Sequence, residues 1–212
     1  MSNPSIEELQ NNDEYELIVE LHHSQIKEFV ISRFTENNLL IKIFMYYQVI
    51  MVLLGIFILT RGIVLSYRGI SEPLFYSLGA LAFSFTILVP IHELLHGISI
   101  KLTGAKKVHY GAYLRKFIFY AEADRHVMNR KQFALVALTP LIIIKVVTLV
   151  GIIVFWHSVW IYFFGMVMAV HSLFCAGDIG LLSVFYADGY ADRFTFDIKA
   201  ERKSYYYQRK NT

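Results

Sequence analysis

Residues 77–102 read SLGALAFSFTILVPIHELLHGISIKL, and this stretch decides both the fold and the chemistry. Apolar residues dominate up to Pro90, and two histidines and a glutamate then follow within HELLH at 92–96. A helix over 74–103 would be about 45 Å long at about 1.5 Å per residue, against a hydrocarbon core of about 30 Å. One end of this helix must therefore leave the hydrocarbon, and Pro90 is expected to kink it.

The composition of the whole chain is that of a membrane protein. Of 212 residues, 56% are hydrophobic and 17% are charged, against about 45–50% and about 25% in soluble domains. The apolar residues gather in long runs, which predict four transmembrane helices at about 44–65, 74–103, 133–155 and 159–186. No apolar core of a cleavable signal peptide is expected, since the first forty residues are polar and acidic.

Positive charge predicts the orientation of these spans. Lys and Arg residues number 17 in the segments on one side and 2 in the segments on the other. The positive-inside rule then places both termini and the long second connection in the cytoplasm. The net charge of +3 comes without a basic cluster interleaved with aromatics, so no nucleic-acid partner is expected.

The predicted fold class is an all-α membrane protein with four transmembrane helices and a small cytoplasmic β-hairpin between the second and third. The hairpin is predicted within KKVHYGAYLRKFIFYAEAD at 106–124, with its turn near Leu114–Lys116, because apolar and aromatic residues alternate there. A cytoplasmic segment 1–40, containing a short strand and a helix within 15–34, precedes the four-span domain 41–186. A polar cytoplasmic tail, 187–212, follows, and its tyrosines 205–207 are expected on the lipid headgroups.

The strongest chemical signal is the HELLH motif. On a helix, His92 and His96 project from the same face, so both imidazoles can reach one metal ion. Glu93 lies about 100° round the helix, beside a metal-bound water. Zinc lowers the pKa of that water to about 7, and the glutamate can take its proton as it attacks a carbonyl. Ionisable groups within a membrane span are costly, and binding to one Zn²⁺ ion would explain why three of them occur together.

Two histidines leave a catalytic zinc one protein ligand short. Asp178 is the favoured third ligand, because it lies 19 residues beyond Val159 while His92 lies 18 beyond Leu74, which puts both at nearly the same depth. His171 is the alternative third ligand, or a polar catalytic group steadying the tetrahedral intermediate, and it is placed two turns before Asp178 on the same helix face.

At this point the residues are similar to a known family. HELLHG at 92–97 on a transmembrane helix, a β-rich connection and a later Gly177–Asp178 resemble the site-2 protease clan of intramembrane zinc metalloproteases. A closer resemblance is to a group of small bacterial membrane proteins described as zincin peptidases. It covers roughly Leu74 to Ile179 and implies a bacterial cell membrane. It also implies zinc at His92, His96 and Asp178, Glu93 as the base, and a β-edge that holds substrate as an added strand.

The chain departs from the site-2 protease pattern at the aspartate. Those proteases usually carry an upstream asparagine and LDG at the ligand, whereas this chain has AGDI at 176–179, and His171 stands near the asparagine position. The first hypothesis is therefore an intramembrane zinc metalloendopeptidase acting on membrane-tethered peptides near the cytoplasmic face. The alternative is a non-catalytic membrane protein, a regulator or immunity factor, in which the metal is structural. Small-residue faces would allow a homodimer.

Overall fold

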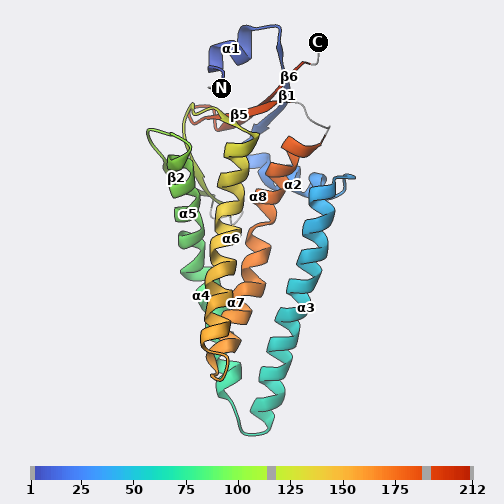
Figure 1. The fold of residues 1–212 in the computed structure, drawn as a ribbon, viewed down its shortest axis with the longest axis vertical. Helices are drawn as coiled ribbons and strands as arrows, with labels where there is room; N and C mark the ends of the chain where they lie inside the picture. Colours follow the sequence, from blue (N-terminus) through green and yellow to red (C-terminus); the bar gives the residue numbers. More distant parts are fainter. Residues whose placement is uncertain (1–2, 114–117, 188–191, 211–212) are drawn as a thin grey trace. The chain divides into compact units, whose positions relative to one another are not determined.

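The computed structural model describes residues 3–113, 118–187 and 192–210 (Figure 1). The helices are α1 (Ile6–Asn11), α2 (Ile26–Arg33), α3 (Leu39–Tyr67), α4 (Glu72–Thr86), α5 (Leu88–Leu102), α6 (Arg130–Val154), α7 (Trp160–Phe174) and α8 (Ala176–Leu182), with 3-10 turns η1 (His23–Gln25) and η3 (Ser183–Tyr186). The strands are β1 (Tyr15–His22), β2 (His109–Tyr113), β3 (Ile118–Glu122), β4 (Met128–Asn129), β5 (Arg193–Ile198) and β6 (Lys203–Arg209).

The chain divides into two compact units, and the division passes through the helices α5 and α6. The first unit contains Met1–Ile41, Glu93–Thr139 and Gly177–Thr212. The second contains Lys42–His92 and Pro140–Ala176. The strands belong to the first unit, and most of the long apolar helices belong to the second.

Among the described residues, three helical segments are long and apolar enough to cross a membrane. They are Leu39–Tyr67, Arg130–Val154 and Trp160–Tyr186. The consecutive helices α4 and α5 also qualify when they are taken together as one bent span, which makes four. The prediction of a largely helical chain with several apolar spans is confirmed to this extent.

The outward face of α3 explains why this helix needs lipid. Of its most apolar 18-residue stretch, only 11% is buried within the structure, and Ile50, Leu53 and Phe57 are all exposed. By contrast, Lys145 in the middle of α6 turns inward: its ammonium donates to the carbonyl of Met168 and lies 5.2 Å from the centre of the Tyr47 ring. Apolar side chains outside and charge inside is the arrangement that a bilayer requires.

The predicted kink in the second span is a break between two helices. α4 ends at Thr86, α5 begins at Leu88, and their axes differ by 47°. Pro90 explains the position, because its missing N–H cannot donate to the carbonyl four residues earlier, at Thr86, and its ring crowds that carbonyl. The bend therefore falls one turn before the proline, and the HELLH motif lies wholly on α5.

Aromatic side chains hold α4 against α7 within the second unit. The ring centres of Tyr76 and Trp160 are 4.9 Å apart in an edge-on arrangement, and those of Phe83 and Phe163 are 5.4 Å apart. Such pairs add to the packing beyond the area that they bury. The second half of the chain is thereby tied to the span that carries the motif.

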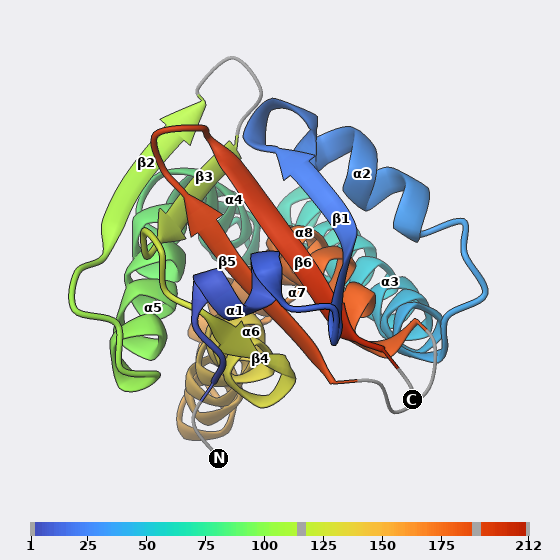
Figure 2. The same cartoon turned by 90° about the horizontal axis from the view of Figure 1, so that it is seen from above.

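The all-α prediction is wrong, because the first unit contains a four-stranded antiparallel sheet in the order β1-β6-β5-β4 (Figure 2). It joins the two segments that were predicted to be separate cytoplasmic ends, since β1 pairs with β6 along its length. Helix α1 packs on it through Leu9, which is buried with Phe196. The tyrosines 205–207 are buried in this sheet and do not lie on headgroups.

The predicted hairpin is present as a separate two-stranded sheet. β2 pairs antiparallel with β3 from His109 opposite Glu122 to Tyr113 opposite Ile118. The predicted turn at Leu114–Lys116 lies outside the described residues. The strand and helix predicted within 15–34 are also present, as β1 and α2.

Asp197 of β5 makes the stability of the sheet dependent on pH. Burial raises the pKa of its carboxyl to about 6, and the carboxylate accepts a hydrogen bond from Ser204 Oγ at 2.6 Å. The unfolded chain releases this proton near pH 4, so between about pH 4 and pH 6 the folded state binds more protons and stability falls as pH rises. Asp197→Asn should therefore raise the unfolding free energy at pH 8 by about 1–2 kcal/mol, and with it the melting temperature. At pH 4 it should have little effect on either.

Thermal unfolding of the purified protein at the two pH values measures this difference. Asp13→Asn, at an exposed position, serves as the control and should leave the melting temperature unchanged at both. A lower melting temperature of Asp197→Asn at pH 8 would mean that the ionised carboxylate stabilises the sheet.

Candidate metal centre

Around the motif, helix α5 turns its two histidines inward and two apolar side chains outward. His92 and His96 are only 5% and 7% exposed, whereas Leu94 is 53% and Ile98 is 47% exposed. In water this pattern would be inverted, but it suits a helix with lipid outside and a polar centre inside. The spacing of four residues puts both imidazoles on the inward face.

The orientation of His96 is fixed by the backbone of α6. Its Nδ1 lies 3.0 Å from the carbonyl oxygen of Val136. A carbonyl oxygen can only accept, so Nδ1 carries the hydrogen and the neutral ring presents a lone pair at Nε2. This is the outer contact that metal-binding histidines usually make, and it sets the tautomer that a metal needs.

That lone pair faces a carboxylate. His96 Nε2 lies 3.2 Å from Asp178 Oδ1 of α8. Two acceptors at this distance repel one another unless a proton or a cation lies between them. Zinc bonds of about 2.0–2.1 Å at a tetrahedral angle would separate such a nitrogen and oxygen by about 3.4 Å. The observed separation therefore suits two ligands of one zinc ion.

Two of the three predicted metal ligands, His96 and Asp178, lie together in the first unit. His92 precedes His96 by about one turn of the same helix, α5. Glu93 follows His92 on the same helix, about 100° round the axis, and is partly buried. The donor set of two imidazoles and one carboxylate is one that catalytic zinc uses, and it leaves a fourth position for water or substrate.

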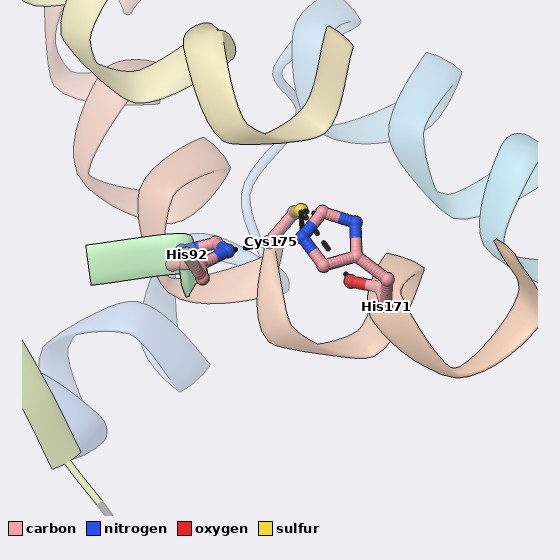
Figure 3. A group of neighbouring side chains, drawn as sticks. All are labelled: His92, His171 and Cys175. Atoms are coloured by element: carbon pink, nitrogen blue, oxygen red, sulfur yellow. Dashed lines mark hydrogen bonds between the residues drawn. The ribbon is translucent and has the colours of Figure 1, made fainter. Parts of the chain in front are cut away.

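A second group of ligand-type side chains also includes His92, and Figure 3 shows it. His92 Nδ1 lies 3.0 Å from His171 Nε2, and Cys175 Sγ lies 3.8 Å from both ring nitrogens of His171. All three residues are buried, with His171 and Cys175 at 0% exposure. His171 is thus in direct contact with one member of the HELLH motif.

The sequence did not predict this contact of His171. The residue was placed on one helix face with Asp178, seven positions later, but α7 ends at Phe174 and α8 begins at Ala176. One residue, Cys175, separates the two helices, and Trp160–Tyr186 together form one candidate span. The sequence marked His171 as a polar residue within an apolar helix. Its contact with His92 became visible only in the structure.

The hairpin of the second connection rests on α5 directly after the motif. A Cβ atom built on Gly97 would lie 1.8 Å from the hydroxyl oxygen of Tyr110 in β2. The Tyr110 side chain can lie in this position because residue 97 has no side chain. The last residue of HELLHG is therefore in contact with a tyrosine of the hairpin.

The arrangement can be compared with known proteins. The family described as "Putative zincin peptidase" matches residues 85–189, a segment that contains the HELLH motif, the hairpin and Asp178. Over residues 85–189 the chain is similar to this family. No curated protein and no solved structure matches the chain. The resemblance to zincin peptidases is confirmed, and a zincin is a peptidase that uses zinc.

Proposed function

We propose that the chain is an intramembrane zinc metalloprotease that hydrolyses peptide bonds of membrane-associated substrates near the cytoplasmic face. The observation that carries the proposal is the contact between His96 Nε2 and Asp178 Oδ1 at 3.2 Å, within a segment that matches the zincin family. Zinc at His92, His96 and Asp178 would relieve that contact. The roles of these residues rest on their geometry and chemistry together.

Glu93 is the base in this proposal. When bound, zinc lowers the pKa of a water to about 7 and polarises the substrate carbonyl. The Glu93 carboxylate accepts the proton of the attacking water and passes it to the amine that leaves as the peptide bond breaks. The buried surroundings of His92 and His96 keep bulk water away and so strengthen these interactions.

The proposed substrate follows from the surroundings of α5. Exposed leucine and isoleucine side chains on this helix suit a substrate that arrives through lipid. The hairpin held at Gly97 offers a strand edge to which an extended peptide could add by backbone hydrogen bonds. A transmembrane segment must lose its helix before it can be cut, and pairing with this edge would compensate the freed backbone groups.

The metal content of the purified protein tests the proposal. The wild type is expected to hold about one zinc per chain, and the variant His92→Ala plus His96→Ala is expected to hold none. Elemental analysis after gel filtration in detergent measures this ratio. His22→Ala plus His157→Ala, which removes two histidines outside the motif, should retain the zinc. A wild-type protein that takes up no zinc when it is supplied would overturn the proposal.

A structural metal site is the second candidate, and the extra ligand types near His92 are the observation that favours it. Structural zinc is held by four protein ligands, and His171 and Cys175 are close enough to His92 to contribute. In that case the protein would be a non-catalytic regulator or immunity factor. It would then show no turnover in the wild type as well as in a Glu93 variant.

A further inference from the structure

His171 is fully buried and its ring is directed at the first histidine of the motif. Its Nε2 lies 3.0 Å from His92 Nδ1, and the two ring planes are inclined by 56°. The contact meets the geometry of a hydrogen bond, in which the N–H of one ring points along the lone pair of the other. One of the two rings must donate here and the other must accept.

Zinc binding decides which ring donates. If His92 Nδ1 were the acceptor, the neutral ring would carry its hydrogen on Nε2, and neither nitrogen could bind a metal. A zinc-binding His92 must therefore carry the hydrogen on Nδ1 and donate it, which leaves the Nε2 lone pair for the ion. His171 Nε2 is then the acceptor.

A hydrogen bond from Nδ1 then orients each histidine of the motif. His96 Nδ1 donates to the Val136 carbonyl, and His92 Nδ1 donates to His171. We propose that His171 is a positioning residue: its Nε2 accepts the hydrogen bond from His92 Nδ1–H, and so fixes the tautomer and orientation in which His92 binds zinc. This inference rests on the proposed zinc site. It makes Asp178 the third ligand and places His171 outside the ligand set.

His171 is itself held by its own helix end. The Cys175 thiol donates to the backbone carbonyl of His171 at 3.4 Å, and its sulfur lies 3.8 Å from His171 Nδ1. The Phe174 ring packs edge-on against the imidazole at a centre distance of 6.3 Å. These contacts leave the ring little freedom to turn away from His92.

The choice of a histidine has a physical reason. Metal-binding histidines often donate to a carboxylate, but a further buried carboxylate would add negative charge to a centre that already contains Asp178 and Glu93. Within a hydrocarbon region each unpaired charge is costly. A neutral imidazole supplies the acceptor without the charge.

Zinc affinity of the full-length protein, measured by chelator competition in detergent, tests the proposal. His171→Phe fills a similar space but cannot accept, and it should weaken zinc binding about 10–100-fold, as loss of an outer-shell partner does. His171→Gln offers an amide oxygen and should restore most of that affinity. Ser172→Ala is the matched control, because Ser172 is equally buried on α7 and bonds to Gln48, and it should bind zinc like the wild type.

The outcomes separate this proposal from the zinc site on which it rests. A wild type without zinc overturns the proposed function, whereas a folded His171→Phe with wild-type affinity overturns only the positioning role. Complete loss of zinc in both His171 variants, with zinc retained in Asp178→Ala, would make His171 a ligand and overturn the proposal. If His171→Phe does not fold, His171→Ala against His171→Gln decides, and equal affinities in that pair contradict the proposal.

Discussion

Replacing Glu93 by glutamine is expected to leave zinc bound while lowering peptide hydrolysis by at least about 10²–10⁴-fold. The amide has nearly the shape of the carboxylate, so His92 and His96 should stay in place. It cannot take a proton from the attacking water or pass it to the leaving amine, however, so both proton transfers lose their catalytic group. Turnover of a membrane-anchored reporter peptide by the protein in liposomes, with zinc content measured on the same sample, provides both readouts.

Glu72→Gln is the matched control for this experiment. Glu72 is an exposed glutamate at the start of α4, so its replacement makes the same chemical change outside the site. It should cleave the reporter at the wild-type rate. Turnover by Glu93→Gln at the wild-type rate would contradict the role of Glu93 as the base, and no turnover by any of the three proteins would favour the structural metal site.

The second large effect is expected from Asp178→Ala, which should lose stoichiometric zinc. The carboxylate is the one negative charge in the proposed ligand set, and two neutral imidazoles alone hold a divalent ion weakly. The loss in affinity should exceed the roughly 10–100-fold expected for an outer-shell residue such as His171. Zinc titration of the metal-free variant and wild type, side by side, gives the two dissociation constants.

Asp192→Ala is a suitable control here, since Asp192 is exposed just before β5. It should bind zinc as the wild type does. Full zinc occupancy in Asp178→Ala at wild-type affinity would show that another side chain completes the site. The contact between His96 Nε2 and Asp178 Oδ1 would then be an ordinary ion pair with a protonated imidazole.

The helices could be predicted because their signal is local. A long apolar run predicts a span without reference to the rest of the chain. Pro90 predicts a bend, because proline lacks the backbone N–H that a helix needs for its hydrogen bond. The sheet was missed because its strands come from the start, the middle and the end of the chain. β6 contains three consecutive tyrosines, 205–207, with no alternation to mark a strand, and its partner β1 lies almost 200 residues away.

The residues of the candidate site also fall into those that local sequence predicts and those that only the fold brings together. His92 and His96 follow from a spacing of four within one helix, and Asp178 follows from counting residues along two spans of the same direction. The hydrogen bond from His92 to His171 could not be read from the sequence, because it depends on how α5 and the end of α7 lie beside each other.

The four-stranded sheet limits how the chain can cross a membrane. Its strands come from before α3, from between α5 and α6, and from after α8, and one sheet lies on one side of a bilayer. The chain between β1 and β4 must therefore end on the side of the bilayer on which it began. If α3 crosses the bilayer once, the bent pair of α4 and α5 has to supply the return. We therefore infer that this pair is a full span and not a loop that enters the bilayer and leaves on the same side.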